Sequence, residues 1–135
     1  MRRFAHCLAL LLVAASPAAS DVLAFRAPSG NINCVMATGD WSGVRCDLTE
    51  LTPSFPVRPM DCDLDWGSVF WLGPTGRGEP TCVGDTVTDP NAFTLEYGKS
   101  VRLGALMCIS ERTGMTCTNG QGHGFILSRA RQQMF

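Results

Sequence analysis

Three carboxylates at alternate positions, Asp61, Asp63 and Asp65, are the candidate metal ligands of the stretch MDCDLDWG. A calcium-binding EF-hand loop also needs a glycine at its sixth position for a sharp turn and a glutamate at its twelfth to close the coordination sphere. Counted from Asp61, those positions hold Trp66 and Leu72. We therefore expect no metal site, and alternation along a strand would place the three carboxylates on a solvated face.

His123, in the stretch NGQGHGFILSR, is the second residue that could carry chemistry. The flanking Gly122 and Gly124 permit unusual backbone conformations, and loops of this kind often carry function. A general base would need a carboxylate partner such as Asp47 or Asp85, and the chain has no serine in a nucleophile elbow. A small hydrolase or lyase that uses His123 stays an alternative, whereas a turn histidine bonded to a neighbouring strand is the favoured interpretation. We expect a non-enzymatic protein without a cofactor.

Trp41 is the third candidate, because it lies between Gly39 and Gly43 at the tip of a predicted hairpin. A tryptophan is hard to bury at such a tip, and an exposed tryptophan often marks a binding surface. Trp41 and His123 are therefore the two candidate binding residues of the chain.

The first 20 residues are typical of a secretory signal peptide. Two arginines precede an apolar run over residues 4–15, and the small residues SPAAS that follow suit a signal peptidase. The run is too short to span a bilayer permanently, and no later stretch approaches the roughly 20 apolar residues of a membrane helix. We expect cleavage of residues 1–20, with Cys7, and one secreted or periplasmic domain over residues 21–135 without stable membrane insertion.

The charge of the remaining chain bears on which classes of partner it can bind. Loss of the signal peptide removes two of the 11 basic residues and none of the 12 acidic residues, so nine basic residues remain and the formal charge is −3. A nucleic-acid-binding domain would present a basic face instead. We expect no nucleic-acid partner and an unknown protein or glycan ligand in the cell envelope or outside the cell.

Six cysteines remain after export, and an even number in an exported chain predicts disulfides. In CISERTGMTC and CVMATGDWSGVRC, two cysteines face each other across a polar turn, which predicts cross-strand disulfides in hairpins. The other two cysteines then pair by elimination, so the predicted pairs are Cys34–Cys46, Cys62–Cys82 and Cys108–Cys117. Zinc binding is the alternative, but the chain has no C-x-x-C pair.

Short apolar or β-branched runs, separated by glycines, prolines and polar turns, recur along the chain. The runs are VLAFRA, NINCVMA, GVRCDL, SVFWLG, TCVGDTVT, SVRLGALMCIS, GMTCTN and GFILSR. They predict an all-β fold, a small sandwich or a partly open barrel, with the proline-rich ELTPSFPVRPMD as a loop between two halves. Ser128 could cap a short C-terminal helical turn through RARQQM.

Several ordered motifs, SGNINC, VRCD, DWG, CVGDT, YG, TGMTC and GHGFILSR, cover the chain from about Phe25 to Arg129. In this order and spacing they resemble a family of small exported bacterial proteins known as a domain of unknown function. The resemblance implies a single secreted domain with six paired cysteines, and it implies no activity, ligand or catalytic residue. We therefore predict a binding module of the periplasm or cell envelope that is stabilised by three disulfides. An inhibitor of a secreted enzyme is a further alternative.

Overall fold

The computed structural model describes residues 12–14 and 20–135, so most of the predicted signal peptide, including Cys7, lies outside the described residues. The described residues form 11 strands and no helix, and thus contain no helix that could cross a membrane. The strands are β1 (Val22–Arg26), β2 (Ile32–Ala37), β3 (Gly43–Leu48), β4 (Val69–Leu72), β5 (Glu79–Pro80), β6 (Phe93–Thr94), β7 (Ser100–Leu103), β8 (Leu106–Glu111), β9 (Gly114–Thr118), β10 (Gly124–Leu127) and β11 (Gln132–Met134).

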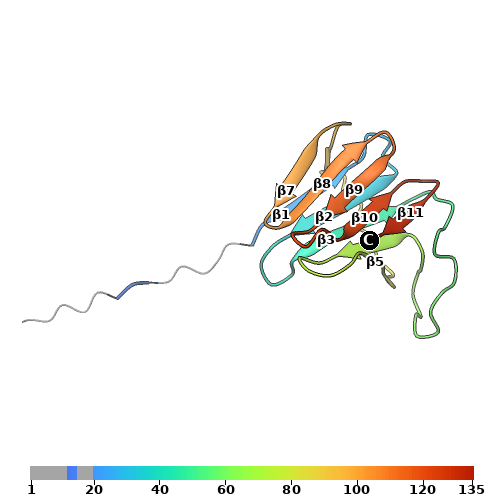
Figure 1. The fold of residues 1–135 in the computed structure, drawn as a ribbon, viewed down its shortest axis with the longest axis horizontal. Coiled ribbons are helices and arrows are strands. Elements are labelled where there is room, and N and C mark those ends of the chain that lie inside the picture. The colour runs from blue at the N-terminus through green and yellow to red at the C-terminus, as the bar shows by residue number, and fades with distance from the viewer. Residues whose placement is uncertain (1–11, 15–19) are drawn as a thin grey trace, which may run out of the picture.

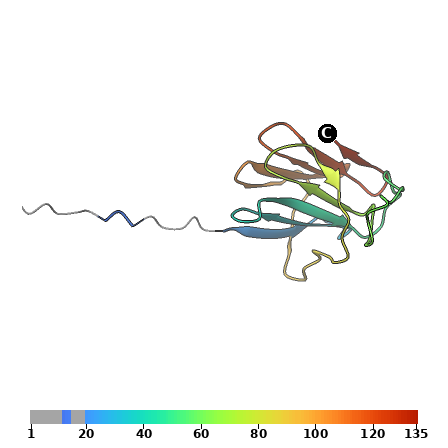
Figure 2. The same cartoon turned by 90° about the horizontal axis from the view of Figure 1, so that it is seen from below.

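The strands form two sheets, which appear as two layers in Figure 1 and Figure 2. The first sheet has the order β5-β4-β3-β2-β1-β6, and the second has the order β11-β10-β9-β8-β7. Neighbouring strands are antiparallel, except β1 and β6, which are parallel. The sheets do not close into a barrel, so the fold is a sandwich and the all-β prediction is confirmed.

The core lies between the sheets because inward and outward side chains alternate along each strand. Along β9, for example, Met115 and Cys117 are buried, while the residues on either side of each are partly exposed. The largest buried side chains come from both sheets, with Phe25 and Phe70 in the first and Phe125 in the second. All of these residues belong to one hydrophobic cluster, so the two sheets share a single core.

Three disulfides join Cys34 to Cys46, Cys62 to Cys82 and Cys108 to Cys117, the same pairs as in the sequence-based prediction. The first lies between β2 and β3 and the third between β8 and β9, each at directly opposed ladder positions. Their Cα atoms are 4.1 Å apart, which is the close spacing of an antiparallel pair that is not hydrogen-bonded. Each sheet therefore carries one buried cross-strand disulfide.

The predicted C-terminal helical turn is wrong. Ser128 does close a turn, in which its hydroxyl and its backbone N–H bind the backbone of Arg131, but the chain continues as β11 and pairs with β10. Gln132 of β11 is buried, and it exchanges two hydrogen bonds with Ser54 of the proline-rich loop, at 2.8 and 2.9 Å. This tertiary contact favours the strand. A capping signal is local in the sequence, so it gives no information about a contact with a residue as distant as Ser54.

Residues 81–92, which we call the strap, cross the outer face of the first sheet from the β5 edge to the β6 edge. The expected strand over TCVGDTVT is not formed, because Val83 pairs only in an isolated bridge with Asp65, and the stretch MDCDLDWG is also irregular. Side chains hold the strap instead. Arg45 of β3 binds Asp85, and Asp47 of β3 accepts a hydrogen bond from the strap backbone.

Candidate binding site

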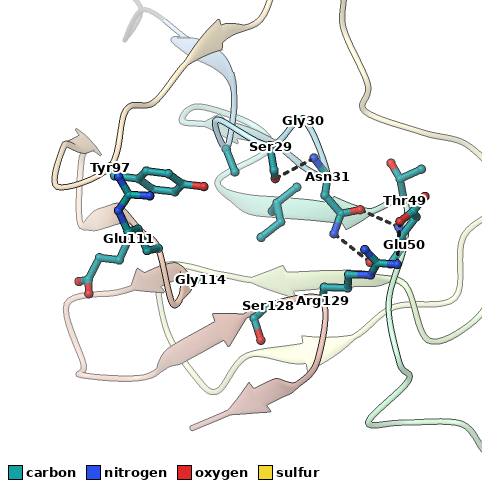
Figure 3. A pocket seen from close by; sticks show the side chains of 13 residues that line it. Ser29, Gly30, Asn31, Thr49, Glu50, Tyr97, Glu111, Gly114, Ser128 and Arg129 are labelled. Atoms are coloured by element: carbon teal, nitrogen blue, oxygen red, sulfur yellow. Dashed lines mark hydrogen bonds and ion pairs between the residues drawn. The ribbon is translucent and has the colours of Figure 1, made fainter.

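A cleft of about 460 Å³ opens at one end of the sandwich (Figure 3). Its walls come from the β1–β2, β8–β9 and β10–β11 turns and from the segments that follow β3 and β6. The lining residues are Ala27, Ser29, Gly30, Asn31, Ile32, Thr49, Glu50, Tyr97, Glu111, Arg112, Gly114, Ser128 and Arg129. Residues far apart in the sequence meet here because both sheets direct these turns to the same end.

The β1–β2 turn forms one wall of the cleft and is fixed by hydrogen bonds. Gly30 has a φ of +76° and donates its N–H to the carbonyl of Ala27 at 2.9 Å, a conformation that favours glycine. The side chain of Asn31 then bridges to Glu50. Its amide donates to the Glu50 carbonyl at 2.8 Å, and its oxygen accepts from the Glu50 N–H at 2.7 Å. The wall is thereby joined to the end of β3.

One aromatic ring and four charged side chains are the groups of the cleft that could contact a ligand. The guanidinium of Arg112 lies 4.9 Å from the centre of the Tyr97 ring, within the range of a cation–π contact. On the other side of the cleft in Figure 3, Arg129 pairs with Glu50 at 3.1 Å, and both side chains are largely exposed. Glu111 is the fourth charged residue. The charges of the lining therefore balance, with two positive and two negative groups.

The lining offers contacts for a polar ligand. Among the described residues that line the cleft there is no histidine or cysteine, and the hydroxyl of Ser128 is engaged in its own turn with Arg131. The two basic and two acidic side chains of the lining sum to no net charge. The ring of Tyr97 offers an apolar face, and the surrounding hydroxyl, guanidinium and carboxylate groups offer hydrogen-bond donors and acceptors.

The carboxylates of MDCDLDWG do not form part of the cleft. Asp61, Asp63 and Asp65 are all exposed. Over residues 12–14 and 20–135, no group of three or more His, Cys, Asp or Glu side chains is placed to hold a metal ion. We therefore assign these carboxylates to the solvated surface near the strap.

Trp41 lies in the β2–β3 turn, at the opposite end of β2 from the cleft, and 45% of its surface is exposed. The six residues of β2 separate the two ends by about 17 Å. The Trp41 ring packs against Trp71 of β4, with ring centres 4.8 Å apart. Trp71 in turn lies against Gly43, where any side chain would overlap the indole. Trp41 thus belongs to an aromatic pair on the first sheet, away from the cleft.

His123 lies in the β9–β10 turn, also at the end away from the cleft. Its N–H donates to the side-chain oxygen of Asn119 at 3.2 Å, and its carbonyl accepts from the Asn119 N–H at 2.9 Å. The ion pairs within the described residues involve Arg45 and Arg129, and His123 takes part in none of them. A hydrolase that pairs His123 with a carboxylate therefore finds no support in this geometry. Trp41 contacts Trp71, whereas His123 contacts Asn119.

A second polar cluster, formed by Arg45, Asp47 and Asp85, lies between the strap and the outer face of the first sheet and anchors the strap. Arg45 and Asp47 have side chains 12% and 10% exposed, whereas that of Asp85 is 76% exposed. Burial by itself would lower the pKa of Arg45, but hydrogen bonds to Asp47 and Asp85 outweigh burial and raise that pKa above its ordinary value. The hydrogen bond from Arg45, together with its charge, lowers the pKa of Asp85. Both groups stay ionised, and the cluster acts as a structural clamp.

Tyr97, Arg112 and Arg129 line the cleft but were not among the candidate residues predicted from the sequence. Each lies in a turn, and the neighbouring glycines or serines mark those turns in the sequence. Turn residues are usually exposed, however, and their linear order does not bring these three together. Only the order of β8, β9 and β10 in one sheet and the packing of that sheet on the other place them around one cleft.

Comparison with known proteins identifies one family. A model described as "Family of unknown function (DUF6636)" matches residues 5–135 of the chain. No significant match is found among curated proteins or among solved structures. The matched range includes every strand and every turn that builds the cleft.

Proposed function

The chain belongs to this family of unknown function, DUF6636, and we propose that it is an exported binding module that holds a polar ligand without net charge in the end cleft. The observation that carries the proposal is the convergence of five segments on one cleft with balanced charges and an exposed aromatic ring. A saccharide unit of the cell envelope fits this description, because its hydroxyl groups need donors and acceptors and its ring face is apolar.

The dimensions of the cleft support a ligand of this kind. Its volume of about 460 Å³ lies within the roughly 300–1,000 Å³ that is typical of small-molecule sites. Tyr97, which is 38% exposed, would pack against the ring face of the ligand, while Arg112 and Glu111 would bind its hydroxyl groups. The bridge between Asn31 and Glu50 holds one wall in place before the ligand arrives, which lowers the entropic cost of binding.

The cysteines support export to the periplasm or beyond. All six cysteines within residues 20–135 are paired in disulfides, and such bonds persist mainly in oxidising compartments. The predicted signal peptide would deliver residues 21–135 to such a compartment. The proposal therefore places the module in the periplasm or outside the cell, where envelope saccharides are accessible.

The test is isothermal titration calorimetry of the exported protein with chitotetraose and with cellotetraose, two oligosaccharides without net charge. Tyr97→Ala should weaken binding by about tenfold or more, because it removes the aromatic contact. Trp41→Ala is the matched control, since it removes an exposed aromatic ring at the other end of the sandwich.

The two variants separate the cleft from the aromatic pair. Binding that is lost in Trp41→Ala and kept in Tyr97→Ala would place the site at Trp41, the residue that the sequence suggested, and would contradict the cleft. Failure of both saccharide probes to bind the wild-type protein would exclude the proposed ligand class. Thermal denaturation of each variant shows whether its fold is intact.

A further inference from the structure

The longest connection between two strands, residues 49–68, carries an exposed apolar tip that the end cleft does not use. We call residues 56–61 the tethered loop, and this green segment projects from the side of the two layers in Figure 1 and Figure 2. Val57 is 82% exposed and Met60 is fully exposed, at 103% of the reference area. Val57 and Met60 are the most exposed large apolar side chains within residues 20–135, which makes them candidate contact residues.

Both ends of the tethered loop are fixed to the sandwich. Before the loop, Ser54 exchanges hydrogen bonds with buried Gln132, and the ring of Phe55 packs against Phe70 with centres 6.2 Å apart. After the loop, the Cys62–Cys82 disulfide attaches the chain to the start of the strap. Trp66 then donates its indole N–H to the carbonyl of Phe55 at 2.9 Å and so joins the two ends.

The prolines limit the conformations of the loop itself. Pro56 and Pro59 have fixed φ angles, and each also restricts the residue before it. The carbonyl of Pro59 accepts the N–H of Cys62 at 3.0 Å, which closes the loop on its C-terminal side. The apolar tip is therefore held in place before any partner arrives, and docking costs little further entropy.

The charges around the tip distinguish between two classes of partner, an anionic membrane and a protein. Within residues 56–65, Arg58 is the one basic residue, and Asp61, Asp63 and Asp65 are exposed acids. The segment therefore carries a net charge of −2. An anionic bilayer surface attracts basic segments and repels acidic ones. The same acids favour a protein surface whose apolar hollow is bordered by lysine or arginine.

We propose that the tethered loop docks a folded protein of the envelope, with Val57 and Met60 in an apolar hollow and the three aspartates facing basic residues at its border. Such a contact would use the alternating acids of MDCDLDWG, which belong neither to a metal site among the described residues nor to the cleft. It is independent of the saccharide proposed for the cleft, because none of these residues lines that site.

The experiment uses the exported protein with a photo-cross-linking amino acid at position 57 or 60, and at position 22 as a control. Val22 is an exposed valine, 65% accessible, at the start of β1. A protein that cross-links at 57 and 60 but not at 22 is identified by mass spectrometry and purified, and its affinity for the unlabelled protein is measured. We expect the double variant V57S/M60S to bind this purified protein about tenfold more weakly, whereas V22S binds as the wild type does.

The contribution of the aspartates is measured separately, through the dependence of the affinity on salt concentration. D61N/D63N should weaken the complex at about 0.1 M salt, and the difference from wild type should shrink at about 1 M salt, where charges are screened. Absence of any adduct at 57 or 60 beyond that at 22 would overturn the proposal. An adduct with a second copy of this chain would overturn it in favour of self-association. Cosedimentation with phosphatidylethanolamine–phosphatidylglycerol vesicles that V57S/M60S abolishes would overturn it in favour of a membrane.

Discussion

Replacement of Asp47 by asparagine should loosen the strap and destabilise the sandwich. The Asp47 carboxylate accepts three hydrogen bonds: from Nε of Arg45 at 2.8 Å, from Nη2 of Arg45 at 3.0 Å and from the N–H of Val87 at 3.0 Å. An asparagine of the same shape has one oxygen in place of two. At least one of the three donors would then face an amide NH₂ group, which cannot accept a hydrogen bond.

The expected cost of Asp47→Asn is about 3 kcal/mol in the free energy of unfolding. Loss of one partner of a buried ion pair typically costs about 3–5 kcal/mol, because the other charge stays buried without compensation. Asp47 and Arg45 are both largely buried, but Arg45 keeps the carboxylate and the carbonyl of Asp85 as acceptors. The estimate therefore lies at the lower end of that range.

Urea denaturation of the oxidised protein measures the effect, with Asp85→Asn as the matched control. Asp85 is exposed and its asparagine can still accept from Arg45, so the control should unfold close to the wild-type midpoint. If Asp47→Asn and Asp85→Asn had the same midpoint, burial would not decide the strength of the clamp and the reasoning would be refuted.

Three further perturbations test other parts of the structure. Gly124→Ala should prevent accumulation of folded protein, measured as export yield and melting temperature, because its Cβ would overlap the Cys117 carbonyl oxygen. Gly120→Ala, whose Cβ meets nothing closer than 3.6 Å, should be tolerated. Cys34→Ala/Cys46→Ala should lower the free energy of unfolding by about 3 kcal/mol in urea titrations, as expected for a loop of this length. The lowered pKa of Asp85 contributes stability that is present above the unfolded carboxyl pKa of about 4 and is lost as the pH falls through the folded value. The melting temperature of Asp85→Asn should therefore depend less on pH in acid than that of the wild type.

Local sequence signals predicted the hairpins of the fold well. The cysteines of CISERTGMTC and CVMATGDWSGVRC are close in sequence, so their pairing needed only a turn between two strands. The all-β class followed from short β-branched runs between turn residues. Elements that depend on distant contacts were missed. β5 and β6 have two residues each and leave no periodic pattern, and β11 depends on the contact between Gln132 and Ser54.

The candidate site could not be predicted in the same way. Trp41 and His123 were selected because their own residue types and flanking glycines are distinctive, which is a local criterion. The cleft is made from turns that span the chain from Ala27 to Arg129, and each turn is ordinary when considered alone. Its position is a property of strand order and of sheet packing, and neither is encoded within a single stretch.

The burial of the two cross-strand disulfides constrains the order in which the chain can assemble. Cys34, Cys46, Cys108 and Cys117 are at most 1% exposed, so an oxidant reaches their thiols only before the sheets close over them. Each pair is separated by only 12 or 9 residues, so an isolated hairpin brings its thiols together before long-range contacts form. We therefore expect oxidation of the two hairpins to precede closure of the sandwich.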